Sequence, residues 1–118
     1  MTDEEIGEFS RQLEELYPGS HIKVADDHKE MVAEKSGEFA VAVIEKSQAH
    51  FHLKTQETYR VLRGTLYLAC GGSGHVLHEG ESMTIQPGQV HFARGAGSPA
   101  IIEVFCKPPW SASDHFVL

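Results

Sequence analysis

The sequence predicts an all-β domain of short antiparallel strands, folded as a small sandwich or barrel and preceded by one N-terminal α-helix. Three observations lead to this fold class. The chain has 118 residues, which is enough for one domain. Only the first 19 residues carry apolar side chains at helical spacing. After Gly19, short apolar runs alternate with Gly, Pro and Asp turn residues, as is typical of sandwiches and barrels.

The N-terminal segment has the signals of a helix start and a helix end. Thr2 and Glu5 have the spacing of a capping box, and Pro18-Gly19 ends the helix. One apolar stripe runs along it, made of Ile6, Phe9, Leu13 and Leu16. We expect residues 1–19 to be a helix that packs on the outside of the domain or across a dimer interface. Residues 20–118 then form the barrel and a packed C-terminal tail.

Strands are predicted along the rest of the chain. The strongest is Phe39–Ile44, whose almost wholly apolar composition predicts burial on both faces. The others are at residues 21–24, 31–33, 58–62, 65–70, 75–78, 82–85, 90–94 and 100–106. Residues 71–74 are predicted to be a flexible hairpin end. The tail after Pro108-Pro109 has neither a helix nor a strand pattern, although its aromatic residues indicate that it packs.

Composition and charge exclude several classes of function. The net charge is −7, and residues 1–36 alone, with ten acids and four bases, carry −6 of it. Nucleic-acid binding needs a basic surface, which this chain lacks. No apolar run approaches the roughly 20 residues of a membrane span, and the acidic N-terminus is not a signal peptide. Cys70 and Cys106 stand alone, so reduced thiols in a cytoplasmic protein are expected.

Four residues have the spacing of a metal site. His50 and His52 are two apart, so a strand would project both from one face, with α-carbons about 7 Å apart. Glu57 lies five positions after His52, so only a turn within residues 53–56 can return it to that face. His91 follows the predicted turn at Pro87-Gly88, which fixes its direction.

These residues resemble the two motifs of the cupin superfamily. The first motif is matched by His50, His52, Glu57 and Gly64, and the second by Gly80, Gly88 and His91. Three positions depart from the family pattern. Ile44 stands where the first motif begins with Gly, Gln86 replaces a Pro, and Gly95 replaces an Asn. None of these departures removes a ligand position, so they bear on loop geometry.

The resemblance implies a cupin-like jelly-roll barrel in which His50, His52, Glu57 and His91 bind one divalent transition metal ion. Three imidazoles and one carboxylate suit Mn, Fe, Ni, Cu or Zn, and the sequence does not choose among them. The alternative is that the four residues are buried polar groups that satisfy one another without metal.

Other candidate residues are fewer. Strand alternation places Tyr59 on the same face as Glu57, and Cys106 ends the last long strand. Both are candidates for the substrate pocket, with ordinary core packing as the alternative. Lys54 is interpreted as a solvated lysine, and His115 as a tail residue that would at most cover the barrel mouth. The remaining histidines are expected at the surface: His21, His28, His75 and His78.

The resemblance leaves three functions open. Residues 50–64 are similar to the corresponding segment of cupin-type sugar-phosphate isomerases, which favours an isomerase or lyase acting on a small sugar, sugar phosphate or polyol. An Fe- or Mn-dependent dioxygenase and a non-catalytic ligand-binding or sensor barrel are the alternatives. No general base is identifiable in the sequence. We expect the partners to be a small-molecule ligand and a second copy of the chain in a homodimer.

Overall fold

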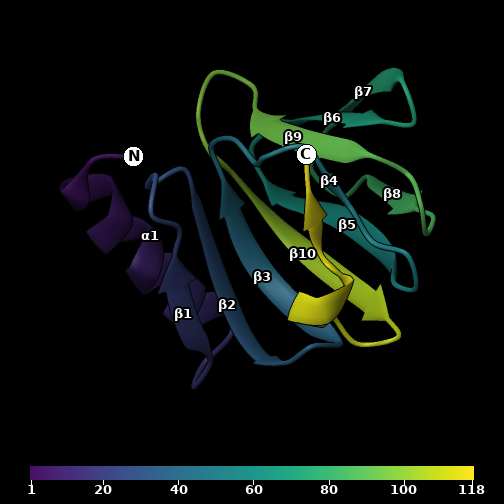
Figure 1. The fold of residues 1–118 in the computed structure, drawn as a ribbon. Coiled ribbons are helices and arrows are strands. Elements are labelled where there is room, and N and C mark those ends of the chain that lie inside the picture. Colours follow the sequence, from purple (N-terminus) through teal and green to yellow (C-terminus); the bar gives the residue numbers. More distant parts are fainter.

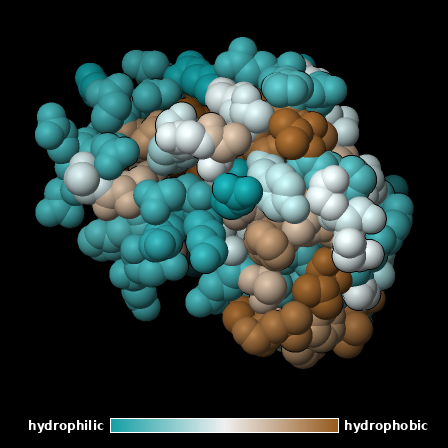
Figure 2. Space-filling model, turned by 90° about the horizontal axis from the view of Figure 1, so that it is seen from above, coloured by the Kyte–Doolittle hydropathy of each residue, from teal (hydrophilic) through white to brown (hydrophobic).

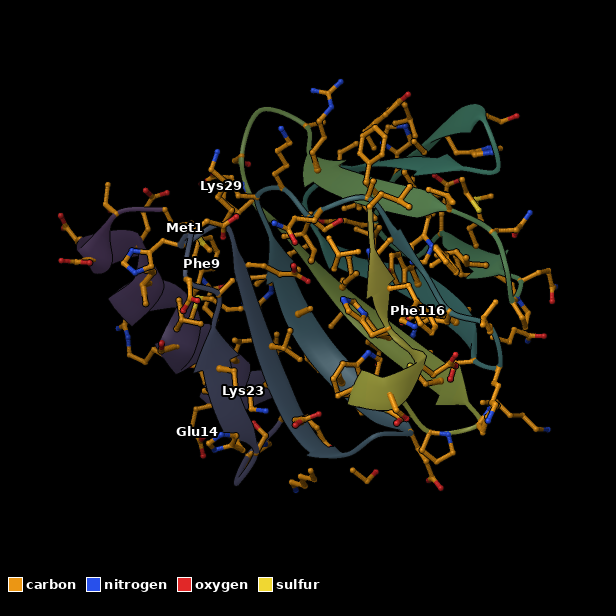
Figure 3. The ribbon with its side chains drawn as sticks, viewed as in Figure 1. Met1, Phe9, Glu14, Lys23, Lys29 and Phe116 are labelled. Carbon is orange, nitrogen blue, oxygen red and sulfur yellow. The ribbon has the colours of Figure 1, made fainter.

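Helix α1 (Asp3–Leu16) covers the outside of a β-sheet in the computed structural model, which describes residues 1–118 (Figure 1). The helix starts as predicted. The Thr2 hydroxyl accepts a hydrogen bond from the Glu5 amide, and the Glu5 carboxylate accepts one from the Thr2 amide. Its apolar stripe faces the sheet, where Leu13 is completely buried and Phe9 packs beside it (Figure 3). No helix of the structure has the length and apolar character that a membrane span requires.

The strands form two antiparallel sheets. The first has six strands in the order β1 (His21–Val24), β2 (Glu30–Ser36), β3 (Phe39–Ile44), β10 (Ala100–Lys107), β5 (Gln56–Arg63) and β8 (Ser82–Ile85). The second has five strands in the order β11 (Phe116–Val117), β4 (His50–Phe51), β9 (His91–Gly95), β6 (Leu66–Cys70) and β7 (Ser73–Leu77). The two sheets face each other without closing into a continuous barrel (Figure 1). The predicted all-β jelly roll with one N-terminal helix is therefore confirmed as a two-layer form of that fold.

Two apolar cores lie on opposite faces of the six-stranded sheet. One fills the space between the sheets and the other lies beneath α1. Strand β3 belongs to both, because Ala42 and Ile44 face the inner core whereas Val41 and Val43 face the helix. The predicted burial of this strand on both faces is thus achieved within one chain. Burial of β3 consequently gives no support to a dimer.

The C-terminal tail is more ordered than its sequence pattern indicates. A 3-10 helix, η1 (Ala112–Asp114), leads into β11, which pairs with β4 and places Phe116 opposite Phe51. Their rings stack with centroids 5.1 Å apart. A strand of two residues is too short to show a periodic pattern in the sequence. It is stabilised by pairing with a distant strand and not by local propensity.

The predicted hairpin end at residues 71–74 is confirmed at Gly71 and Gly72, which form the turn between β6 and β7, but not at the next two residues. Ser73 and Gly74 already belong to β7 and pair with Cys70 and Ala69. The Tyr67 ring lies over Gly74, where a Cβ atom would overlap it. This glycine therefore serves close packing within a strand, not chain flexibility.

Candidate metal centre

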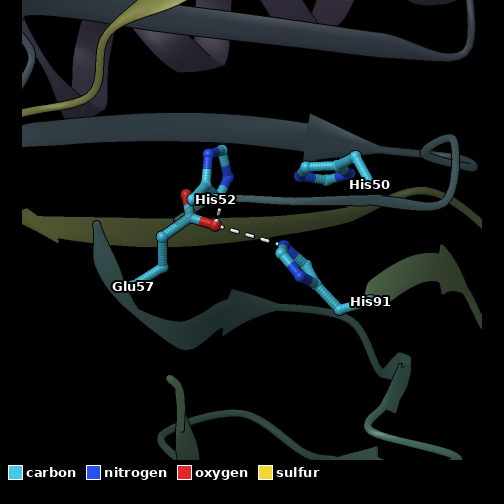
Figure 4. A group of neighbouring side chains, drawn as sticks. All are labelled: His50, His52, Glu57 and His91. Carbon is cyan, nitrogen blue, oxygen red and sulfur yellow. Dashed lines mark hydrogen bonds and ion pairs between the residues drawn. The ribbon is translucent and has the colours of Figure 1, made fainter. Parts of the chain in front are cut away.

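The four residues with metal-site spacing converge at one point between the sheets (Figure 4). His50, His52, Glu57 and His91 are all buried, and their ligand-type atoms lie within 4.8 Å of one another. Their exposed fractions are 8%, 3%, 5% and 1%, so solvent hardly reaches them. The structure thus brings together every residue of the predicted ligand set.

Strand pairing and two turns produce this convergence. His50 on β4 is the direct cross-strand partner of His91 on β9. The chain turns at Leu53 and Lys54 and returns as β5, which carries Glu57 back toward the histidines, as the odd spacing requires. The turn before His91 has Gly88 at φ +84°, a conformation that favours glycine.

The departures from the family pattern leave these loops intact. Gln86 keeps the backbone amide that a proline would lack, and this amide donates to the Gln89 side chain at 2.8 Å. Gly95 lies against the Ser98 carbonyl, so that any Cβ atom there would overlap it. Ile44, in place of the leading glycine, is buried in the inner core.

Each histidine is held through its Nδ1 atom by a backbone carbonyl. His50 donates to Gln48 at 2.8 Å, His52 to Asp114 at 2.6 Å and His91 to Gln89 at 3.0 Å. A carbonyl oxygen only accepts, so the Nδ1 atoms carry the protons. In the neutral rings, the Nε2 lone pairs are then free to bind a metal ion. This support of ligand histidines by outer hydrogen bonds is typical of metal sites.

The charges of the cluster call for a cation at its centre. The Glu57 Oε1 atom lies 3.0 Å from His52 Nε2 and 3.2 Å from His91 Nε2. His52 Nε2 is buried yet not aligned for a hydrogen bond with any group. If both rings were neutral, lone pairs would face a carboxylate, which is unfavourable in a buried site. A divalent ion removes this conflict, so the four residues fit a metal.

The ionisation of these groups agrees with a cation-binding site. Burial alone would raise the pKa of Glu57, but the close contacts and charges of His52 and His91 outweigh it and hold that pKa well below its usual range. Burial lowers the pKa of His50 to about 4, which keeps its ring neutral. Burial acts against protonation of His52 too, but contact with Glu57 raises its pKa overall. A metal ion would take the place of that proton.

Cys106 and Tyr59 both line the cavity beside this cluster. The Cys106 thiol donates to the second Glu57 oxygen, Oε2, at 3.6 Å. Burial and the Glu57 charge raise the Cys106 pKa to about 12, so the group is a neutral thiol. Tyr59 faces inward from β5, as alternation predicts, and its exposed fraction is 7%. Burial and the charges of Glu57 and Glu30 raise the pKa of its hydroxyl, which is therefore a neutral donor.

Asp114 supports the centre from the C-terminal tail, and sequence reasoning missed it. Its carboxylate accepts hydrogen bonds from the amides of Leu53, Lys54 and Thr55, the turn between His52 and Glu57. These bonds hold the pKa of Asp114 below its usual value, against the effect of burial. Its carbonyl also holds His52. No local pattern signals this role, because the contacts span about sixty residues.

His115 lies closer to the centre than the sequence indicates. Its ring centroid is 4.7 Å from that of His50, 5.3 Å from that of His52 and 5.8 Å from that of Trp110. Its Nδ1 atom is buried without a hydrogen-bond partner. The remaining predicted surface histidines stay away from the site, and Lys54 is exposed.

The cluster opens on a cavity of about 610 Å³. Part of its wall on the six-stranded sheet is apolar and includes small residues: Val32, Ala40, Ala42, Ile102 and Val104. Glu30, at the start of β2, also lines this cavity, and sequence reasoning missed it. Nothing in the local sequence distinguishes Glu30 from the other acids of the N-terminal third.

Comparison with protein families matches residues 37–105 to the cupin domain. This chain therefore belongs to the cupin family, as the fold and the arrangement of His50, His52, Glu57 and His91 also indicate. No curated protein sequence matches it significantly.

Solved structures share the fold at low identity. The capsular polysaccharide assembling protein CapF from Staphylococcus aureus is 15% identical, with a TM-score of 0.72 over 86% of this chain and 32% of CapF. An oxalate decarboxylase mutant from Bacillus subtilis is 15% identical, with a TM-score of 0.71 over 86% of this chain and 31% of that protein. The nucleoside dehydratase Pac13 from Streptomyces is 13% identical, with a TM-score of 0.66 over 82% of this chain and 84% of Pac13. This chain thus spans about a third of the first two proteins and most of the third.

Proposed function

We propose that this protein is a metal-dependent isomerase or lyase that acts on a small uncharged hydroxy-carbonyl compound, such as an open-chain sugar or a product of polyol oxidation. The observation that carries this proposal is that the histidine and glutamate cluster borders a ligand-sized cavity. A purely structural ion would be enclosed by protein groups, whereas a catalytic ion keeps positions open to substrate.

Within this proposal, His50, His52, Glu57 and His91 hold the ion. A bound divalent ion would supply Lewis-acid polarisation of substrate oxygens. The Tyr59 hydroxyl faces the cavity as a neutral donor and suits a substrate oxygen. The apolar wall on the six-stranded sheet excludes water from the reacting atoms and packs against the carbon skeleton of the substrate.

The charges along the cavity favour an uncharged substrate over a sugar phosphate. Five carboxyl groups line it, from Asp26, Asp27, Glu30, Glu34 and the proposed ligand Glu57, against two lysines and no arginine. A phosphate ester would therefore meet a cavity with more acidic than basic groups.

The lyase alternative is supported by the chemistry that this fold carries elsewhere. Pac13 is a nucleoside dehydratase, and the Bacillus subtilis protein is an oxalate decarboxylase. Both names describe bond-breaking reactions without hydrolysis. For this chain, the support lies in the shared fold alone.

We also propose a homodimer. Apolar side chains are exposed near the C-terminal end, on Leu53, Phe116, Val117 and Leu118. Apolar residues also gather on one side of the view in Figure 2, whereas hydrophilic residues dominate the side of α1. Strand β11 is the edge of its sheet and leaves one side of its backbone unpaired. An apolar edge of this kind is favourable for contact with a second copy.

The test uses protein loaded with Mn(II) and a panel of sugars, each paired with its phosphate ester. We expect the uncharged member of a pair to raise the melting temperature more, and NMR to show its conversion under nitrogen. A larger shift with the phosphate ester would contradict the proposed substrate class. Conversion by Fe(II)-loaded protein only in air, with oxygen consumed, would instead identify an oxygenase. Binding without conversion would identify a ligand-binding barrel.

A further inference from the structure

Glu30 is a half-buried acid on the cavity wall that metal binding does not use. It opens strand β2, opposite Ile44 of β3. Alternate residues of β2 face opposite ways, so Met31 and Ala33 pack under α1 whereas Glu30 and Val32 line the cavity. The Glu30 side chain is therefore directed by the strand toward the space where a ligand would lie.

No protein group compensates the Glu30 carboxyl. It forms neither an ion pair nor a hydrogen bond, although Lys46 lines the same cavity. A half-buried carboxyl without a partner contributes nothing to packing and loses part of its hydration, so packing alone does not explain the residue. Burial, together with the negative charges of Asp27 and Glu57, raises the pKa of Glu30 to about 7. A group that is partly protonated near neutral pH is well suited to proton transfer.

Tyr59 lines the same cavity as Glu30 and the candidate metal centre. The charges of both Glu57 and Glu30 contribute to the raised pKa of its hydroxyl. All three side chains line one cavity. A substrate oxygen at the centre and a substrate carbon facing Glu30 would therefore belong to the same small molecule.

We propose that Glu30 is the general acid–base of this cavity, a role that rests on the isomerase or lyase function proposed above. Its carboxylate takes the proton from a carbon next to a substrate carbonyl. The C–H bond breaks, its electron pair forms a carbon–carbon double bond, and the carbonyl π pair moves to oxygen. In an isomerisation, Glu30 then returns the proton to the former carbonyl carbon, while a hydroxyl proton moves between the two oxygens. In an elimination, the proton goes to the group that leaves with its bonding electron pair.

A matched control lies on the same strand. Glu34 lies four residues after Glu30 on the same face of β2 and also lines the cavity. Unlike Glu30, it lies 3.9 Å from a cation, the Lys23 ammonium. Glu34→Gln therefore removes a cavity carboxyl without removing the proposed base.

The experiment measures deuterium incorporation into hydroxyacetone by NMR, in D2O, with Mn(II)-loaded protein. We expect exchange at the carbons next to the carbonyl with the parent protein, and with Glu34→Gln a rate much closer to that of the parent than to that of Glu30→Gln. Glu30→Gln should slow it at least about a hundredfold, the usual contribution of a positioned base. Glu30→Asp, which keeps a carboxylate, should restore part of the rate.

Metal content and the exchange rate of the parent protein distinguish failure of the Glu30 assignment from failure of the proposed function. Glu30→Gln should keep the parental manganese content, because Glu30 is outside the ligand set. Parental exchange in Glu30→Gln would overturn the assignment and leave the proposed function standing, whereas no exchange by loaded parent protein would overturn both.

A pH titration followed by carbon-13 NMR gives a readout that is independent of activity. The signal of the Glu30 carboxyl carbon is the one that disappears from the spectrum of Glu30→Gln. It should titrate near neutral pH. The other ionisable groups that line this cavity are Lys23, Asp26, Asp27, Glu34, Lys46, His50, His52, Glu57, Tyr59, Cys106 and His115. Titration in the ordinary glutamate range, about 4.3, would also overturn the assignment.

Discussion

Backbone carbonyls hold all three histidines of the centre by Nδ1, and this common feature decides what the residues can do. The bond fixes both the ring direction and the tautomer, so the Nε2 atoms meet at one point before any ion arrives. The centre is therefore organised in advance, and loss of one ring cannot be replaced by movement of another.

Replacing His52 should abolish most metal binding. We expect His52→Ala to lower bound metal at least about tenfold, because it removes one of four ligands. Metal analysis by mass spectrometry after equal loading gives the measurement. His75→Ala and His78→Ala are the controls, since both residues lie outside the cluster. Equal metal content in His52→Ala and the parent would refute the ligand assignment.

Tyr59→Phe should separate packing from ligand contact. The ring stays in the inner core, so the melting temperature should change little. If the hydroxyl donates to a ligand, affinity should fall by about 1–3 kcal/mol, because a buried polar partner is left unpaired. Calorimetry with the best sugar from the panel measures this. Unchanged affinity would show that Tyr59 serves only the core.

Glu30 should make stability depend on pH. Its pKa is about 7 in the folded chain and near 4.5 when unfolded, so the folded state holds the extra proton between these values. Stability contributed by this residue therefore falls as pH rises from about 4.5 to about 7, and then levels off. Glu30→Gln lacks this loss, so its melting temperature relative to the parent should rise over that range. An unchanged difference between the two proteins across the range would contradict the raised pKa.

At the level of single residues, the sequence predicts the metal-ligand positions but not the other residues that shape the site. His50, His52 and Glu57 follow from strand alternation and one turn, both of which are local rules. Asp114 acts through hydrogen bonds with residues that lie far away in the chain, and Glu30 reaches the cavity because β2 pairs with β3. Such contacts depend on which strands become neighbours, and no spacing within a single sequence records that.

Among the elements, the C-terminal tail has the greatest influence on the centre. Its 3-10 helix places Asp114 against the turn at Leu53–Thr55, and β11 pairs with the strand that carries His50. The tail therefore holds residues 50–55 at both ends by hydrogen bonds, and this segment supplies two of the three histidines.

Asp114→Asn should weaken the hydrogen bonds between the tail and residues 53–55. One of the two carboxylate oxygens becomes an amide group that cannot accept a hydrogen bond, so the three amides of residues 53–55 lose part of their acceptor. We expect metal affinity to fall about tenfold or more, as is usual when a residue that positions a metal ligand is replaced. The melting temperature should also fall. Competition with a chromophoric chelator measures the affinity. Ser113→Ala, in the same 3-10 helix, is the control. Equal affinities of the Asp114 variant and the parent would contradict the supporting role.

The elements that sequence predicts well are those with a local signal. The capping box and apolar stripe define α1, and Gly-Pro punctuation defines most strand ends. By contrast, β11 is too short for a pattern, and Gly74 suggests a loop where the Tyr67 ring requires a glycine in a strand. In both cases tertiary contacts outweigh local preference.

For the whole molecule, the proposed homodimer predicts a definite mass in solution. We expect light scattering to give twice the chain mass of 13.0 kDa. Val117→Lys places a charge on the exposed apolar edge at β11 and should shift the protein toward the single-chain mass. Lys29→Glu, at a distance from this edge, is a charge-change control (Figure 3). A mass near 13.0 kDa for the parent at high concentration would contradict the dimer.

Strand β3 offers a practical route for protein engineering. Its odd-numbered residues Val41 and Val43 contact the helix, whereas its even-numbered residues Ala40 and Ala42 bound the cavity. Enlarging or shrinking an alanine therefore changes which molecules fit without altering the helix interface. Conversely, the helix side can be repacked to compensate a costly change in the cavity. Substrate range and thermal tolerance can thus be selected in separate libraries of one short strand.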